Sequence, residues 1–202
     1  MKRTLLLLSA LSLGAISAFA ADGQILINQS AAIAAGGFPY TITQPGSYKL
    51  SGNLTAPLNT AAILVYASNV SIELNGFTVG CSYDQTFSGS AVCVVFAQGS
   101  NRTLRNGFVT VSANSIAQYT VLIGVNMALS TGNTIEYVNA SAPNLSGATS
   151  IQFGDHTIFR FNVASGAGPY LGCPSLIEGN VNLSGKIFDP GSCVLVNNVG
   201  AW

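Results

Sequence analysis

The sequence predicts an all-β protein in which about seven coils of parallel strands stack after one short helix. A short alternating segment recurs along the chain at intervals of 18 to 32 residues, and stacked repeats have periods of this size. The segments in between are rich in Gly, Ser, Asn and Ala, as turns and loops are. Charged residues make up 7% of the chain, against about a quarter of an ordinary globular domain. This scarcity disfavours long exposed helices and a basic face for nucleic acid.

The N-terminal residues predict export. Lys2 and Arg3 precede the apolar run 5–8, and residues 18–20 (Ala-Phe-Ala) have the A-x-A pattern of a cleavage site. We therefore expect residues 1–20 to be a secretory signal peptide, because the apolar run is too short for a membrane-spanning helix. The mature chain, with five Lys/Arg, seven Asp/Glu and a net charge near −2, would be secreted or periplasmic, without a transmembrane segment.

Residues 21–45 are expected to form an N-terminal cap, and residues 46–202 the repeats. Residues 24–35 predict a helix because they are rich in Ala, carry apolar residues seven apart, and precede a Gly-Gly stop. The repeated segments are rich in Val, Ile, Thr and aromatic residues, which predicts strands. A two-sheet sandwich would instead need antiparallel hairpins with two-residue turns. The central apolar residues of the seven segments are Leu50, Ile72, Leu104, Ile135, Ile158, Ile177 and Leu195.

Three segments resemble the repeats of bacterial right-handed parallel β-helix proteins of the pectin-lyase-like superfamily. They are residues 42–54 (ITQPGSYKLSGNL), residues 69–77 with their I-E-L-N-G-F, and residues 104–107 (LRNG). The resemblance implies a right-handed, single-stranded parallel β-helix whose first coil is plugged by the helix of residues 25–35. Members of this superfamily include polysaccharide lyases, glycoside hydrolases, phage tailspikes and copper-loading periplasmic proteins, so the fold does not settle the function.

Stacking the repeats predicts two columns of polar side chains. Asparagine tolerates the left-handed backbone of a bend, and its amide can bond to the coils above and below. Charged residues beside the central apolar positions alternate in sign and, at about 4.8 Å per coil, lie within ion-pair reach. We interpret this column as fixing register; the competing interpretation is a groove in which its arginines grip an acidic polymer. The expected asparagine ladder is Asn75, Asn106, Asn139, Asn162, Asn180 and Asn198, and the expected charge ladder is Glu73, Arg105, Glu136, Arg160 and Glu178.

The mature chain carries four cysteines, an even number that predicts disulfides in an exported protein. Cys173 and Cys193 are 20 residues apart, about one local coil, and stacked coils bring Cα atoms within the roughly 4.4–6.8 Å that a disulfide accepts. Cys81 and Cys93 would then close the intervening loop. No metal or other cofactor is expected, because the chain has no Cys-x-x-Cys pair and a single histidine.

Catalytic candidates are few. The acidic residues form no Asp-Asp or Asp-x-Asp pattern that would suggest a calcium site or the paired carboxyls of a hydrolase. Asp155, His156 and Arg160 form one constellation, a base oriented by a carboxylate with an arginine for an acidic sugar. The alternative is that His156 is a bend residue, because it falls at the position that Asn101 and Asn133 have in earlier copies.

Aromatic residues of the middle and later coils are candidate sugar-stacking side chains, with core packing as the alternative for each ring. We expect an exported, non-catalytic protein that binds glycan or a cell-surface partner, or serves as a structural unit. The alternative is a polysaccharide lyase or glycoside hydrolase acting on an acidic polysaccharide. An open last coil predicts either that Trp202 folds over the end or that the end self-associates. The candidate rings are Tyr119, Tyr137, Phe159 and Tyr170.

Overall fold

The structure is a computed structural model that describes residues 23–84, 89–113, 119–143, 148–166, 169–170, 172–184 and 192–200. The expected signal peptide and Trp202 lie outside these residues. Within them the chain forms twenty strands and one helix, which confirms the expectation of an all-β protein.

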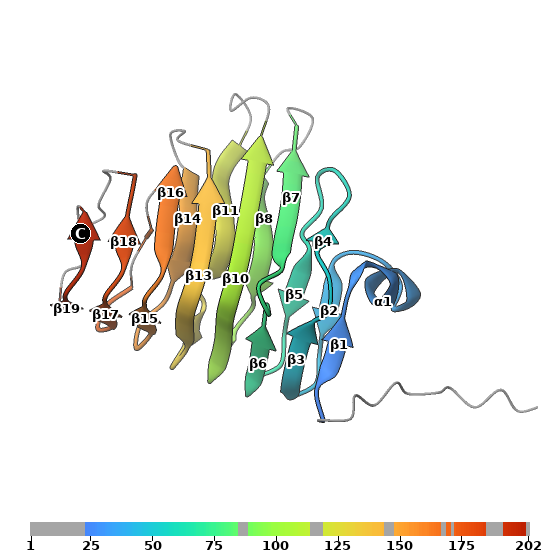
Figure 1. The fold of residues 1–202 in the computed structure, drawn as a ribbon, viewed down its shortest axis with the longest axis horizontal. Coiled ribbons are helices and arrows are strands. Elements are labelled where there is room, and N and C mark those ends of the chain that lie inside the picture. Colours follow the sequence, from blue (N-terminus) through green and yellow to red (C-terminus); the bar gives the residue numbers. More distant parts are fainter. Residues whose placement is uncertain are drawn as a thin grey trace, which may run out of the picture.

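All pairings between these strands are parallel, as expected. The largest sheet has 13 strands, and along its main path each strand pairs with its counterpart one repeat later. Figure 1 shows these strands side by side in sequence order, from the helix at one end to β19 at the other. The main path is β1 (Ile25–Ile27), β3 (Gly46–Leu50), β6 (Val70–Glu73), β10 (Arg102–Ala113), β13 (Thr134–Ala142), β15 (Ile158–Arg160), β17 (Leu176–Glu178) and β19 (Val194–Val196).

A bend divides each repeat of this sheet. The long strands β10 and β13 run through the bend and pair with separate short strands on its two sides. The strands beyond the bend are β4 (Leu54–Thr55), β7 (Thr78–Tyr83), β16 (Val163–Gly166), β18 (Val181–Asn182) and β20 (Val199–Gly200). The second sheet lies behind the first in Figure 1 and contains β2 (Tyr40–Ile42), β5 (Ile63–Val65), β8 (Gly89–Phe96), β11 (Tyr119–Met127) and β14 (Ala148–Phe153). A two-stranded sheet pairs β9 (Gly99–Ser100) with β12 (Ser130–Thr131).

The register defines one apolar column that faces the interior. Two of the expected central residues are wrong: Ile72 pairs with Tyr48 rather than Leu50, and Ile135 pairs with Phe159 rather than Ile158. Ile158 has an apolar neighbour, Phe159, and a shift of one residue sends a side chain to the other face of a strand. Leu50 lies two residues after Tyr48 on the same face and is also buried, so the alternation in β3 fits either residue. The interior column is Tyr48, Ile72, Leu104, Ile135, Phe159, Ile177 and Leu195.

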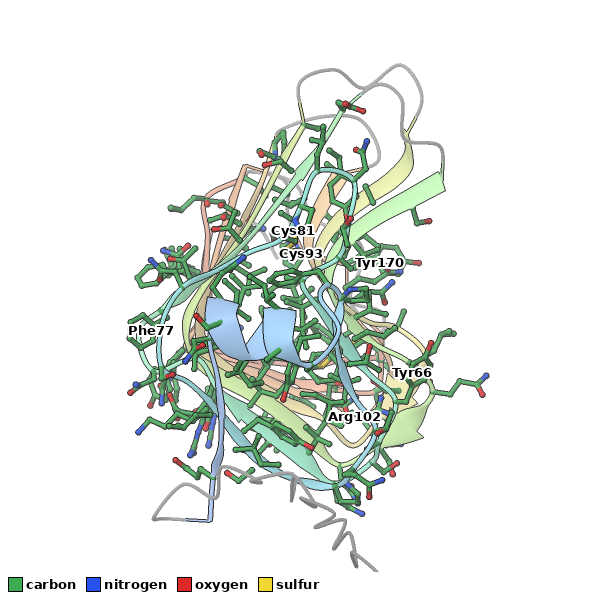
Figure 2. The ribbon with its side chains drawn as sticks, turned by 90° about the vertical axis from the view of Figure 1, so that its right-hand side faces the viewer. Tyr66, Phe77, Cys81, Cys93, Arg102 and Tyr170 are labelled. Carbon is green, nitrogen blue, oxygen red and sulfur yellow. A yellow bond between two sulfur atoms is a disulfide. The ribbon has the colours of Figure 1, made fainter. Side chains whose placement is uncertain are left out.

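The N-terminal helix is shorter than the expected helix 24–35. Residues Ile25–Ile27 form strand β1, paired with β3, because this aliphatic run favours a strand, and the helix α1 spans only Gln29–Ala34. Asn28 caps α1 by accepting a hydrogen bond from the Ala31 amide (2.9 Å). The cap is therefore part strand and part helix. Figure 2 shows α1 across the end of the space between the two sheets, where its one buried side chain, Ala32, joins the core.

Two disulfides reinforce the stack, with the pairing that the spacing suggested. Cys81 of β7 and Cys93 of β8 join the two sheets through the interior, with Cα atoms 5.4 Å apart. Figure 2 shows this bond between the sheets. Cys173 and Cys193, with Cα atoms 5.1 Å apart, tie together two successive repeats near the C-terminal end.

Candidate functional site

The expected charge ladder lies in register on the outer face of the main sheet. Glu73 pairs with Arg105, Arg105 with Glu136, Glu136 with Arg160, and Arg160 with Glu178. The ladder gains a sixth member, because Lys49 is in register with Glu73. Three cations and three anions therefore alternate along this column, and their formal charges cancel.

The ion pairs within the ladder differ in closeness. The Nε and Nη2 atoms of Arg160 lie 2.8 and 2.7 Å from Oε2 of Glu136. Arg105 is 2.8 Å from Glu73 and 4.0 Å from Glu136, and its Nε–H is not aligned with an acceptor, so its contacts are electrostatic rather than hydrogen bonds. The hydrogen bond and the charge of Glu136 raise the pKa of Arg160 above its ordinary value. Both arginine side chains remain about two-fifths exposed.

From Arg105 to Glu178, the residue directly after each ladder residue is left-handed, and the backbone bends there. In the repeats of β10, β13 and β15 this residue is Asn106 (φ 57°), Tyr137 (φ 54°) and Phe161 (φ 55°). Gly179 (φ 61°) and Asn197 (φ 50°) continue the column. Asn and Gly are the usual residues of this conformation, whereas a bulky aromatic residue there is a genuine outlier.

The two aromatic residues of this column are exposed and stacked. The ring centroids of Tyr137 and Phe161 lie 5.2 Å apart with planes 21° from parallel, and the residues are 53% and 41% exposed. The guanidinium of Arg160 lies 6.0 Å from the Phe161 ring centre. Phe108, 43% exposed, begins the segment beyond the bend of the preceding repeat. We call Phe108, Tyr137 and Phe161, with Arg105 and Arg160 beside them, the aromatic corner.

Only part of the expected aromatic set lies on the surface. Phe159 is fully buried and packs against Phe153 with ring centres 5.0 Å apart, so its assignment as a sugar-stacking residue is wrong. Phe159 occupies the interior column, in the place where the sequence led us to expect the preceding residue, Ile158. Tyr170 is 44% exposed next to the second sheet, away from Tyr137. Tyr119 begins β11, and its side chain lies outside the described residues.

The structure does not assemble the catalytic constellation. Asp155 and His156 are exposed in the turn before β15, whereas Arg160 at the end of β15 bonds to Glu136. Among the described side chains, Arg160 forms an ion pair with Glu136, and Asp155 takes part in none. His156 has the left-handed backbone of a bend residue (φ 56°), which favours the structural interpretation. It aligns with Asn101 and Gly132, so the expected alignment with Asn133 is one residue out.

The expected asparagine ladder forms in the last three repeats, from Asn162 to Asn198, and the earlier asparagines have other partners. Asn180 Oδ1 accepts hydrogen bonds from the amide and side chain of Asn162 (2.8 and 3.1 Å), and Asn198 Oδ1 accepts the same two bonds from Asn180 (2.9 and 3.0 Å). Asn139 does not belong to the ladder, because it lies one position further on and pairs with Val163. Asn75 and Asn106 are left-handed bend residues, whose side chains donate to Leu50 O and to Glu73.

Arg102 is a buried cation that the sequence did not reveal. It is 1% exposed, and its guanidinium donates to the backbone carbonyls of Tyr66, Ala67, Ala97 and Gln98. Burial lowers the pKa of Arg102. Two of these carbonyls come from the preceding repeat and two from its own, so Arg102 ties two repeats together at the corner opposite the aromatic rings. Figure 2 shows Arg102 and Tyr66 on the side away from Phe77.

A comparison of the chain with protein-family models, curated proteins and solved structures finds no significant match. Among the described residues, no helix is long and apolar enough to cross a bilayer. In the same part of the chain, no group of three or more His, Cys, Asp or Glu side chains is placed to hold a metal ion.

Proposed function

We propose that the protein is an exported, non-catalytic, right-handed parallel β-helix of the pectin-lyase-like kind that binds a neutral polysaccharide along its aromatic corner. The parallel pairing of every repeat with the next supports the β-helix, as does α1 across the end of the interior. Two disulfides are compatible with an oxidising compartment, and therefore with export.

The observation that carries the binding function is the aromatic pair Tyr137–Phe161. A bulky residue in a left-handed position costs on the order of 1–3 kcal/mol, and such strain concentrates at functional sites. The same column uses Asn106 and Gly179 in neighbouring repeats, so the fold has no need of rings there. Their exposed surfaces and the Tyr137 hydroxyl offer what a sugar needs, an apolar face with a polar handle beside it.

The charges of the corner favour a neutral ligand. Along the ladder each exposed arginine already faces a carboxylate, Glu73 or Glu136, so the column has no net charge with which to attract a polyanion. The paired groups still present hydrogen-bond donors and acceptors at intervals of one repeat, about 4.8 Å. A polymer of regularly spaced hydroxyl groups can lie along such a column, and a uronic-acid polymer would have to displace the internal carboxylates.

We do not propose a lyase or hydrolase. Those reactions require a free base or a pair of carboxyl groups near the substrate. The acids of the aromatic corner are engaged in the ladder. Asp155 and His156 lie in an exposed turn, and neither forms an ion pair with another described side chain.

The test is a binding screen of the purified protein against neutral and uronic-acid polysaccharides, followed by calorimetry on fragments of the best ligand. Tyr137→Ala and Phe161→Ala should each weaken binding at least about tenfold, equivalent to about 1.4 kcal/mol. Tyr66→Ala is the matched control, because Tyr66 is equally exposed (56%) but lies at the opposite corner. Equal binding by all three variants, a preference for acidic polymers, or release of new reducing ends would contradict the proposal.

A further inference from the structure

The outward-facing columns become aliphatic toward the C-terminal repeats. In the column beside the charge ladder, hydroxyl residues of the earlier repeats give way to aliphatic ones. Beyond the bend, a mixed column that includes Phe108 and Asn139 ends in valines. The ladder column ends in the same way, because Val196 follows Glu178 where the alternation calls for a cation. The first column is Ser47, Ser71, Thr103, Thr134, Ile158, Leu176 and Val194, and the second is Thr78, Phe108, Asn139, Val163, Val181 and Val199.

Within the described part of the chain, the last strand of the main path, β19, is paired along one edge and open along the other. Among the described strands, β19 pairs with β17 and with no other. Leu195 belongs to the interior column, yet it is 42% exposed, whereas Ile177 one repeat earlier is fully buried. Val194 is 59% exposed. The strand carries neither proline nor a charged residue, the residues that protect an open edge from pairing.

We propose that this end binds the same end of a second copy of the chain, with the two β19 strands antiparallel about a two-fold axis. The Val194 amide donates back to Ser175, and the Val196 carbonyl accepts from Gly179. Residues alternate their backbone groups between the two edges of a strand, so Leu195 presents its N–H and C=O to the open edge. An antiparallel pair centred on Leu195 satisfies both groups in both copies.

The side chains fit this arrangement. Centring the pair on Leu195 sets Val194 of one copy opposite Val196 of the other, twice, and β-branched cross-strand pairs are favourable. The two Leu195 side chains then meet and close the interior columns, which removes from water the one member of that column that is exposed in a single copy. Each element of the contact is self-complementary, as a two-fold interface requires.

Val196 is the reason that two identical ends can meet. A cation there would lie diagonally across the axis from the same cation of the other copy, at about 7–8 Å. With Val196, the nearest ladder charges are the two Glu178 carboxylates. These are separated by about three strand spacings, or ~14 Å, beyond the screening length of about 10 Å at 0.1 M salt. Head-to-tail growth is disfavoured because α1 crosses the other end of the stack, so the assembly closes at two. This inference is independent of glycan binding.

Sedimentation velocity over a wide range of protein concentration, with hydrogen exchange at residues 194–196, tests the proposal. We expect a monomer–dimer equilibrium and slower exchange of the Leu195 amide as the dimer forms. Val194→Lys should raise the dimer dissociation constant at least tenfold. Ser71→Lys, in the same column of an inner repeat, should leave it unchanged, and circular dichroism verifies that both variants fold.

Three results would overturn this interface. They are a monomer at every concentration, a series of species larger than the dimer, and a dimer that Val194→Lys does not weaken. If Val194→Lys fails to fold, the concentration dependence of Leu195 exchange in the unmodified protein still decides the question.

Discussion

Tyr137 and Phe161 stack with ring centres 5.2 Å apart on neighbouring repeats, each in a backbone conformation that ordinarily belongs to asparagine or glycine. The residue at this position is Asn106 in the preceding repeat and Gly179 in the following one. Two left-handed aromatic residues cost on the order of 1–3 kcal/mol each, and a stacked pair returns about 0.5–1.5 kcal/mol. The pair therefore lowers the stability of the fold, and a role in binding would explain why it is present.

Replacing Tyr137 by asparagine, the residue of the neighbouring repeat, tests whether the aromatic ring contributes to the stability of the fold. Tyr137→Asn should leave the free energy of unfolding within about 1 kcal/mol of the original or raise it, because relief of strain offsets the lost stacking. Urea denaturation measures this. Phe159→Ala, which empties a buried site, should cost about 3–5 kcal/mol in the same assay. A loss above about 2 kcal/mol for Tyr137→Asn would show that the stack is structural.

Arg102 is expected to stabilise the fold far more than the exposed arginines of the ladder. Arg102→Met removes four partly buried hydrogen bonds from the Arg102 guanidinium to backbone carbonyls, and bonds to a charged group contribute about 1.5–3 kcal/mol each when buried, so we expect a loss of about 3 kcal/mol or more. Arg105→Met should cost less than about 1 kcal/mol, because its ion pairs are partly exposed. Similar losses for the two variants in thermal or urea unfolding would refute the difference.

Asn180 is the central rung of the asparagine ladder. Asn180→Ala removes the acceptor for Asn162 and the donor to Phe159 O, so we expect a loss of about 2–4 kcal/mol. Asn139→Ala, at a position outside the ladder, should change stability by no more than about 0.5 kcal/mol. Equal losses of stability for the two substitutions would contradict the expectation that the ladder hydrogen bonds of Asn180 stabilise the fold.

Tyr83 makes stability depend on pH in the alkaline range. Burial is the main cause that raises the pKa of Tyr83 to about 12, and its hydroxyl donates to Val92 O (2.6 Å). In the unfolded chain the phenol ionises near 10, so the unfolded state binds fewer protons between these values and stability falls as pH rises from 10 to 12. Tyr83→Phe should make this fall shallower in urea titrations at pH 9, 10 and 11. It should not abolish the fall, because burial also raises the pKa of Tyr40 and Tyr48. An unchanged slope would contradict the assignment.

The features that depend on one strand and its nearest equivalent in the next repeat were readable in the sequence. The recurrence of apolar and charged residues predicted parallel strands and the pairs Glu73–Arg105 and Glu136–Arg160, because stacking places equivalent residues side by side. The spacing of Cys173 and Cys193 predicted their disulfide for the same reason, and Cys81 and Cys93 were then the remaining pair. Errors arose where two nearby residues were both apolar. Pattern alone does not say whether Ile158 or the adjacent Phe159 faces the interior, nor whether Tyr48 or Leu50, which both face it, is in register with Ile72.

The surroundings of Arg102 and the positions of the exposed rings were decided by the tertiary structure alone, because both depend on backbone geometry at the bends. The cage around Arg102 needs carbonyls from residues 66–67 and 97–98, which converge only when two repeats are stacked. The left-handed conformation of Tyr137 and Phe161 contradicts local preference, so no propensity argument could place those rings at a bend. Side-chain pattern is a property of the chain, whereas the direction of a carbonyl or a ring is set by the long-range contacts that hold the backbone in place.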